Sequence, residues 1–304
     1  MSVAQKYHTP VMLNECIEYL NIHPDGIYVD ATFGGGGHSR AILNHLSENG
    51  KLFAFDQDKD AQQNLPDDKR LTFIPYNFSF ITQWLNYYKV LKVNGILADL
   101  GVSLHQFNKP ERGFSYRFNS PLDMRMNQQQ KLTAADVVNN YSQQQLENIF
   151  QNYGDLKNAR KIAHLIIQYR FEKKIETTFD LIDAIKPALP KVNDYPILSR
   201  IFQSIRIEVN QEVEALKKFL NQTYDLLDTH GRIVVLTYHS LEDKIVKHFF
   251  IHGHTDKTLE PDPVFGKIQH PFKIITKKPI EPKQEEILAN PQARSAKLRC
   301  AEKI

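Results

Sequence analysis

Short apolar runs alternate with segments of helical periodicity over about the first hundred residues of the chain. Each apolar run has the length of a buried strand, and several of the segments between them repeat apolar positions every three or four residues. This alternation is typical of a parallel sheet whose strands are joined by crossover helices, so we predict an α/β fold. The predicted strands are Ile27–Ala31, Leu52–Phe55, Leu71–Ile74 and Gly95–Ala98, and the predicted helices lie near His38–Leu46 and Phe80–Leu91.

The alternation stops after about Leu104, and only helix patterns remain as far as Asn210. We therefore predict a small all-helical domain, residues 105–210, inserted into a discontinuous α/β domain of residues 1–104 and 211–304. Helix starts are predicted at the capping-box patterns Thr133–Asp136 and Ser142–Gln145, helices at Lys157–Phe171, at Phe179–Lys186 and from Ser199, and a surface loop at Lys191–Pro196.

The strand and helix pattern resumes after the insert and completes the sheet. A capping-box pattern, Ser240 with Asp243, predicts another helix start there. The remaining predicted elements are a helix at Glu212–Leu227, a turn at Gly231, and strands at Ile233–Thr237, Phe272–Thr276 and Ala296–Cys300.

The composition excludes several classes of protein. The 304 residues are 41% hydrophobic and 24% charged, with a mean hydropathy of -0.44, which is the profile of a globular protein. The longest apolar runs are far shorter than the ~20 residues of a membrane-spanning helix, so we expect no membrane partner. The N-terminus lacks a secretory signal pattern, and Cys16 and Cys300 are too few for a disulfide framework or a cysteine metal site. We therefore expect a cytoplasmic protein.

Positive charge is only slightly in excess, with 38 Lys and Arg against 35 Asp and Glu, but it is clustered. Solvated helix faces and loops explain such clusters in most proteins, and an anionic partner is the alternative. The clusters are Arg160–Lys161, Arg170 with Lys173–Lys174, and a C-terminal group of Lys267, Lys273, Lys277, Lys278, Lys283, Arg294, Lys297 and Arg299.

Four consecutive glycines, Gly34–Gly37, lie between the first predicted strand and the next helix. Glycine has no Cβ and adopts positive φ, so this turn allows a ligand to approach the backbone closely, and a nucleotide-like cofactor is the usual ligand. A dinucleotide fingerprint would need a third glycine where Ser39 or Arg40 stands, and the phosphate-loop pattern is absent. The turn therefore predicts neither a nicotinamide dinucleotide nor a nucleoside triphosphate.

Asp56 closes the second predicted strand, 20 residues after Gly36, where an acid can accept hydrogen bonds from the hydroxyls of an adenosine ribose. Sites for NAD and for S-adenosylmethionine share this placement. S-adenosylmethionine carries a sulfonium cation and no phosphate, so it needs neither the third glycine nor a basic residue, and it fits this turn better. A glycine-rich turn with a solvated aspartate is the alternative.

Asp99 ends the fourth predicted strand, at the carboxyl edge of the sheet where open α/β folds bind their ligands. This position makes Asp99 the best candidate for the catalytic region. A turn or capping carboxylate is the alternative.

Eight motifs spread along the chain resemble those of one family. They are His8–Val11, Asp30–Ser39, Asp99–Ser103, Arg112–Ser115, Pro121–Met126, Arg206–Asn210, His239–Asp243 and Asn290–Ser295. Through them the chain is similar to the bacterial small-subunit ribosomal RNA cytosine-N4 methyltransferase family, RsmH, formerly MraW. The resemblance implies a Rossmann-like class I S-adenosylmethionine-dependent methyltransferase sheet with an inserted small all-helical domain. It also implies methyl transfer from S-adenosylmethionine to the exocyclic N4 of a cytidine in the decoding region of 16S ribosomal RNA, and no metal is expected.

The resemblance assigns the cofactor contacts to positions of this chain, with an acid at the ribose and an aromatic ring beside the adenine. Two positions depart from the family pattern: Leu104 stands where a second serine is usual, and Lys244 where an arginine is frequent. The contacts implied for S-adenosylmethionine are Gly36, Gly37, His38, Asp56 at the ribose, Phe78 at the adenine, Asp99 and Gln106.

The exocyclic amine of cytosine is a weak nucleophile because its lone pair is delocalised into the ring. A carboxylate or carbonyl that accepts a hydrogen bond from the amine orients it and stabilises the positive charge that develops on nitrogen. We hypothesise that Asp99 or the adjacent backbone has this role, with His239 as a second catalytic candidate, followed by Ser240 and Glu242. A capping role for His239 is the alternative.

The target base must leave its stack to reach the cofactor, which calls for aromatic or guanidinium side chains near the site. A cluster of such residues after Asp99 is predicted to form the entrance for the base, and core aromatics at the domain junction are the alternative. The basic positions of the insert would contact the RNA backbone. The cluster comprises Phe107, Arg112, Phe114, Tyr116, Arg117 and Phe118.

The implied partner is 16S ribosomal RNA, within the small subunit or a late assembly intermediate, and the sequence leaves open whether the chain forms a homodimer. Two other functions stay open at this point. One is a nicotinamide-dependent oxidoreductase, which the glycine pattern opposes. The other is an S-adenosylmethionine-binding RNA chaperone or assembly factor, which transfers no methyl group to RNA.

Overall fold

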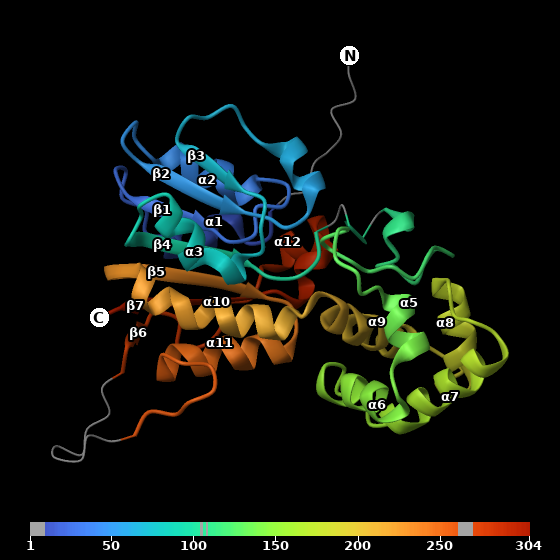
Figure 1. The fold of residues 1–304 in the computed structure, drawn as a ribbon. Helices are drawn as coiled ribbons and strands as arrows, with labels where there is room; N and C mark the ends of the chain where they lie inside the picture. Colours follow the sequence, from blue (N-terminus) through green and yellow to red (C-terminus); the bar gives the residue numbers. More distant parts are fainter. Residues whose placement is uncertain (1–9, 104–105, 108, 261–269) are drawn as a thin grey trace. The chain divides into compact units, whose positions relative to one another are not determined.

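The computed structural model describes residues 10–103, 106–107, 109–260 and 270–304 (Figure 1). The chain divides into two compact units. The sheet unit comprises Met1–Gly101 with Glu214–Ile304, and the helical unit comprises Val102–Val213. The sequence-predicted positions that lie outside the described residues are His8 and Thr9, Leu104 and residue 105 at the first domain boundary, and Lys267.

A seven-stranded sheet, in the order β3-β2-β1-β4-β5-β7-β6, forms the centre of the sheet unit. The first five strands are parallel, and β7 is antiparallel to both of its neighbours. Because β2 and β4 lie on opposite sides of β1, the carboxyl ends of β1 and β4 flank a topological switch point, where open α/β sheets bind ligands. The strands are β1 (Ile27–Asp30), β2 (Lys51–Phe55), β3 (Leu71–Ile74), β4 (Val93–Asp99), β5 (Leu227–Thr237), β6 (Phe272–Ile274) and β7 (Lys297–Lys303).

Helices cover both faces of this sheet (Figure 1). The helical elements of the sheet unit are α1 (Leu13–Leu20), α2 (Gly37–His45), α3 (Ile81–Tyr87), α10 (Glu212–Leu226), α11 (Ser240–His252), α12 (Gln284–Ala289), η1 (Lys59–Asn64), η2 (Phe78–Phe80) and η5 (Pro291–Ser295). On one face, Val29 of β1 shares a core cluster with Phe219 of α10 and Phe249 of α11. On the other face, Tyr28 shares a cluster with Cys16 of α1. Neighbouring residues of a strand point to opposite faces, so β1 is covered on both sides.

The seven strands predicted from the sequence are all present, and the largest difference is at the start of β5. The sequence predicts that this strand begins at Ile233, whereas β5 begins at Leu227, which pairs with Val93 of β4. The pairing then shifts, so that Arg232 lies opposite Gly95. The residues between them are polar and largely exposed, which is why an apolar pattern could not reveal the first part of the strand.

The helical unit has an apolar core of its own. Its helical elements are α5 (Ala134–Asn140), α6 (Gln143–Asn152), α7 (Ala159–Glu172), α8 (Thr178–Ile185), α9 (Tyr195–Asn210), η3 (Pro110–Arg112) and η4 (Lys186–Ala188). Both predicted capping boxes are confirmed, at the starts of α5 and α6, and α8 has a third at Thr177 and Asp180. The prediction that the last helix starts at Ser199 is wrong by four residues, because Pro196 lies in the first turn of α9, where proline is tolerated.

Membrane crossing by a helix would need a long apolar segment. Among the described residues, no helix is long and apolar enough to cross a membrane.

Candidate functional site

The glycine turn connects the carboxyl end of β1 to α2. Gly34 and Gly36 adopt positive φ values of 51° and 72°, and Gly36 is the N-cap residue of α2. Asp30 fixes the start of the turn, since its carboxylate accepts hydrogen bonds from the Thr32 N–H at 3.0 Å and the Ser39 hydroxyl at 2.6 Å. A Cβ at Gly34 would meet nothing nearer than an oxygen at 3.9 Å, so this side of the turn is open to a ligand.

Gly37 and His38, the next two predicted contacts, are packed against the N-terminal segment. A Cβ at Gly37 would lie 2.2 Å from Cγ of Pro10, so only glycine fits there. The buried His38 ring places Nε2 3.1 Å from the carbonyl oxygen of Val11 and Nδ1 3.7 Å from Oδ2 of Asp99. His38 thus connects the turn to the end of β4.

Asp56 directly follows β2 and is tied to the glycine turn. Its Oδ2 accepts a hydrogen bond from the Gly34 N–H at 2.8 Å, and its Oδ1 accepts one from the Asp58 N–H at 2.8 Å. Burial raises the pKa of this carboxyl group to about 7, with a further contribution from the charges of Asp58 and Asp30, although the two N–H groups oppose the shift. The acid that the sequence places 20 residues after Gly36 therefore lies beside the turn and titrates near neutral pH.

Asp99 ends β4 on the other side of β1. Its backbone N–H donates to Oγ1 of Thr32 at 2.7 Å, which fixes the strand end against the glycine turn. Its Oδ1 accepts a hydrogen bond of 2.6 Å from the hydroxyl of Tyr238, and Oδ2 is the oxygen nearest to His38. The carboxylate is therefore held in one orientation at the switch point.

Tyr238 is a site residue that the sequence analysis missed. It directly follows β5, and its ring lies over Gly101, where a Cβ would be 3.3 Å from the ring. Burial, followed by the charge of Asp99, raises the pKa of Tyr238 well above its ordinary value, so the hydroxyl stays a hydrogen-bond donor. Its place directly after the fifth strand, at the same sheet edge as Asp99, was the available signal.

His239 caps the helix that follows β5. It is the N-cap residue of α11, and its Nδ1 accepts a long hydrogen bond of 3.5 Å from the Glu242 N–H. Its Nε2 lies 3.1 Å from Oε1 of Glu242, whose Oε2 accepts a hydrogen bond from the Tyr238 N–H. The helix start predicted at Ser240 is confirmed, but the predicted capping box of Ser240 and Asp243 is wrong, because the N-cap side chain is the ring of His239. A catalytic role for His239 stays a prediction.

Phe78 and Gln106 complete the predicted cofactor contacts. Phe78 begins η2, at the same edge beyond β3, and its ring packs edge-on against Phe219 at 5.0 Å. Gln106 belongs to the helical unit, where its Oε1 accepts a hydrogen bond from the Ser103 N–H at 3.2 Å. The sheet unit thus brings together Gly36, Gly37, His38, Asp56, Phe78 and Asp99 at the carboxyl ends of its parallel strands.

The residues predicted to admit the target base differ in exposure within the helical unit. Arg112 is only 2% exposed, and its guanidinium donates to the carbonyl oxygens of Arg125 and Met126. Phe114 is 5% exposed and lies in the unit's core. Burial favours the alternative interpretation of these two residues, a structural one. Tyr116 packs against Phe202 at 5.5 Å and is partly buried, whereas Arg117 is exposed.

Four aspartates give the carboxyl edge a negative charge. Asp30 ends β1, Asp56 and Asp58 follow β2, and Asp99 ends β4. Carboxylates in this arrangement attract a cationic ligand and repel a pyrophosphate. In the described part of the chain, no group of three or more His, Cys, Asp or Glu residues could hold a metal ion.

Comparison with known proteins places this geometry in a family. The MraW methylase family model matches residues 5–304. The chain is 51% identical to ribosomal RNA small subunit methyltransferase H of Phocaeicola vulgatus over 299 residues, 98% of both chains. It is 50% identical to the protein of the same name from Christiangramia forsetii over 304 residues, 100% of both chains. A solved structure, an rRNA methylase from Streptococcus thermophilus, aligns with 96% of this chain and 93% of that chain at 13% identity and a TM-score of 0.40. The sequence matches confirm the family resemblance.

Proposed function

Since this chain belongs to the MraW methylase family, we propose that it methylates the RNA of the small ribosomal subunit. In this proposal S-adenosylmethionine is the methyl donor, and the exocyclic N4 of a cytidine in 16S ribosomal RNA is the acceptor. The predicted Rossmann-like α/β sheet is confirmed. The observation that carries the proposal is the pair of carboxylates, Asp56 and Asp99, held on either side of the glycine turn. The names of the relatives support the choice of RNA.

The residues at this edge fit S-adenosylmethionine. Asp56 uses its two backbone hydrogen bonds for anchorage, and a carboxylate has further lone pairs with which to accept the ribose hydroxyls. The open side of Gly34 allows the cofactor to approach the turn, and Phe78 is placed to wall the adenine. The negative charge of the edge favours a donor with a sulfonium and an ammonium group over a dinucleotide.

The task of this chain in the reaction is to orient a weak nucleophile. When bound, the cofactor supplies a methyl group activated by positively charged sulfur. Asp99 accepts a hydrogen bond from the N4 amine, which directs the nitrogen lone pair out of the ring and stabilises the positive charge that forms on nitrogen. Tyr238, by donating to Oδ1, keeps this carboxylate from rotating.

The helical unit supplies the contacts to RNA in this proposal. Arg117 is exposed and available to the target nucleotide, and Tyr116 is partly exposed beside it. Arg112 and Phe114 support the same loop from inside through the carbonyl contacts and core packing described above. Sequence-independent contacts to phosphates would come from basic side chains of the unit that form no ion pair within the described residues.

A direct test is to incubate the purified protein and labelled S-adenosylmethionine with small ribosomal subunits that lack the modification, and to analyse the nucleosides by mass spectrometry. We expect N4-methylcytidine. Tight cofactor binding without methyl transfer to any RNA would favour the assembly-factor alternative, and methylation at another atom would refute the N4 assignment.

The role of Asp99 is tested by Asp99→Asn, which keeps the shape but removes the charge. We expect turnover to fall about 10²–10³-fold, the range for loss of one electrostatic group that acts on a transition state. Asp68→Asn is the matched control, because Asp68 precedes β3 at the opposite edge and pairs with Arg70. Near-normal turnover of the Asp99 variant would refute this role.

A further inference from the structure

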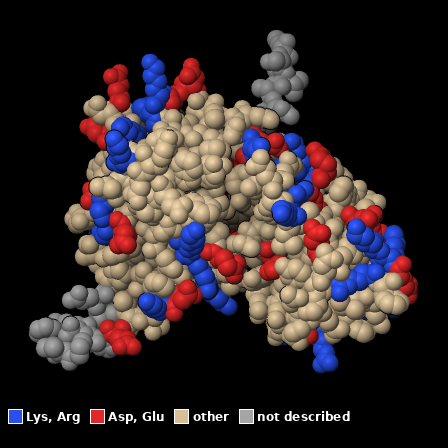
Figure 2. Space-filling model, in the orientation of Figure 1, with Lys and Arg blue, Asp and Glu red and all other residues tan. Residues whose placement is uncertain are grey.

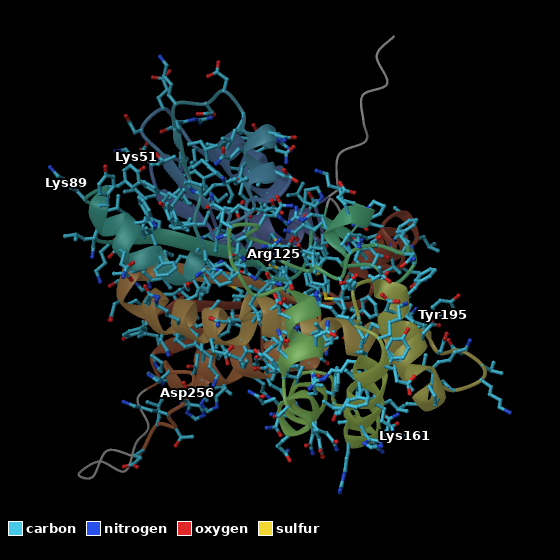
Figure 3. The ribbon with its side chains drawn as sticks, turned by 45° about the vertical axis from the view of Figure 1, so that its right-hand side comes forward. Lys51, Lys89, Arg125, Lys161, Tyr195 and Asp256 are labelled. Atoms are coloured by element: carbon cyan, nitrogen blue, oxygen red, sulfur yellow. The ribbon has the colours of Figure 1, made fainter. Side chains whose placement is uncertain are left out.

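A surface hollow with a volume of about 490 Å³ lies on the helical unit at the start of α7. Four exposed basic side chains and two amides line it. They are Lys157, Arg160, Lys161 and His164, with Gln143 and Asn158. Lys157 precedes α7, whereas Arg160, Lys161 and His164 lie on one side of its first two turns. Figure 3 shows Lys161 at the surface of the unit.

The cations of this hollow differ from Lys173 and Lys174, two other clustered cations of the helical unit. Lys173 pairs with Asp180 at 2.6 Å, and Lys174 pairs with Glu176 at 3.5 Å. Lysine and arginine side chains also lie next to acidic ones at several places on the face shown in Figure 2. Within the described ranges, by contrast, Lys157 and Arg160 form no ion pair, and Lys161 donates only to the carbonyl oxygen of Pro187, at 2.9 Å.

We propose that this hollow binds the phosphodiester backbone of the substrate RNA, an inference that rests on the proposed function. Positive charge that pairs with no carboxylate in the described part of the chain is complementary to phosphate. Arg160 and His164 lie about 6 Å apart along the axis of α7, and Lys157 precedes the helix, so these side chains are spread widely enough to face more than one phosphate. The side chains that line the hollow include no Phe, Tyr or Trp, and contacts of its cations with phosphates position the RNA without reading its sequence.

The size of the effect follows from counterion release. Each phosphate contact to single-stranded nucleic acid changes the slope of log K against log salt by about 0.7, so two cations account for about 1.4. Relative to 1 M salt, two such contacts strengthen binding about 25-fold at 0.1 M. Removal of both cations should therefore weaken binding about 25-fold at 0.1 M salt and hardly at all near 1 M.

The test compares two double variants of the full-length protein. Lys157→Gln with Arg160→Gln removes the two cations that form no ion pair, whereas Lys173→Gln with Lys174→Gln removes the same charge from ion-paired positions. Filter binding to a 16S ribosomal RNA fragment from the decoding region gives Kd as a function of salt. We expect the first variant to show the 25-fold loss and the lower salt slope, the control to stay within about twofold of wild type, and both to bind S-adenosylmethionine normally.

If both double variants lose RNA affinity equally, the assignment of this surface is overturned and the proposed function stands. The same conclusion follows if the first variant loses no affinity although the wild-type protein methylates the RNA. A loss seen with assembled subunits but not with bare RNA would also overturn it and would point to a ribosomal protein. Wild-type protein that neither binds nor methylates the RNA would overturn the proposed function itself, and the surface with it.

Discussion

The carboxyl group of Asp56 should make the affinity for S-adenosylmethionine depend on pH. Its pKa is raised to about 7 by burial, with the charges of Asp58 and Asp30 adding to the shift. Two ribose hydroxyls need two acceptors, which the ionised carboxylate offers, whereas a protonated carboxyl uses one of its sites for its own proton. Cofactor binding therefore selects the ionised form, and affinity falls as pH drops through 7.

The magnitude follows from that pKa. With a value of about 7, roughly 90% of Asp56 is ionised at pH 8 and roughly 10% at pH 6. The Kd for S-adenosylmethionine should therefore rise about tenfold from pH 8 to pH 6, which corresponds to about 1.4 kcal/mol. By the same reasoning, binding at pH 6 should release close to one proton, and binding at pH 8 about a tenth of one.

Isothermal titration calorimetry from pH 5.5 to 8.5, in buffers of different ionisation enthalpy, measures both Kd and proton release. Asp56→Asn should bind weakly at every pH and release no proton. Asp58→Asn should move the midpoint to lower pH, because it removes a charge that raises the pKa of Asp56. A wild-type Kd that is flat across this range, or an Asp56→Asn variant with the wild-type slope, would refute the reasoning.

Three further predictions concern groups described above. Tyr238→Phe should lower kcat about 10–100-fold, because it removes a hydrogen bond to a charged group, and should leave KM for both substrates within about twofold. The control Tyr28→Phe removes a buried hydroxyl that accepts from the His23 N–H and should leave kcat unchanged. Equal effects of the two variants on steady-state kinetics would contradict the positioning role of Tyr238. Gly113→Ala should destabilise the protein by about 2 kcal/mol or more in urea unfolding, because φ is 69° and the new Cβ would lie 2.3 Å from the Pro121 oxygen. Gly34→Ala, where φ is also positive but the space is open, should cost only about 1 kcal/mol. Similar losses in the two variants would show that the loop backbone at Gly113 moves to relieve the clash. Thr177→Ala should lower the free energy of unfolding by about 1 kcal/mol through loss of the capping box of α8, and an unchanged denaturation midpoint would argue against that cap.

The sheet could be predicted from the sequence because its strands are buried on both faces. Strands of this kind are continuous apolar runs, and β1, β2 and the apolar part of β4 follow that rule, whereas only Ile74 is buried in the edge strand β3. The first part of β5 does not, since Leu227 is separated from Arg232 by polar, exposed residues. Its strand character comes from pairing with Val93, a contact that local composition does not reveal.

The candidate site could be predicted only as far as position along the chain determines position in space. Asp56 and Asp99 each follow a strand, so their place at the carboxyl edge was predictable. The hydrogen bond between Asp99 and Tyr238 joins residues 139 positions apart and depends on the pairing of β4 with β5. For Arg112 the position in a loop suggests an RNA contact, whereas its burial and its bonds to two carbonyl oxygens of its own unit depend on tertiary packing that the sequence does not reveal.

The insertion between β4 and β5 also has a consequence for synthesis of the chain. Until β5 has emerged from the ribosome, β4 is an edge strand with unpaired backbone groups on one side. About 130 residues separate Asp99 from Leu227, so at ~5–20 residues per second β4 waits roughly 6–26 s for its partner. Helical units rich in local contacts fold in microseconds to milliseconds, well within that interval. The helical unit therefore forms first and shortens the loop that β4 and β5 must close. Completion of the sheet is then a late step in the synthesis and folding of the chain.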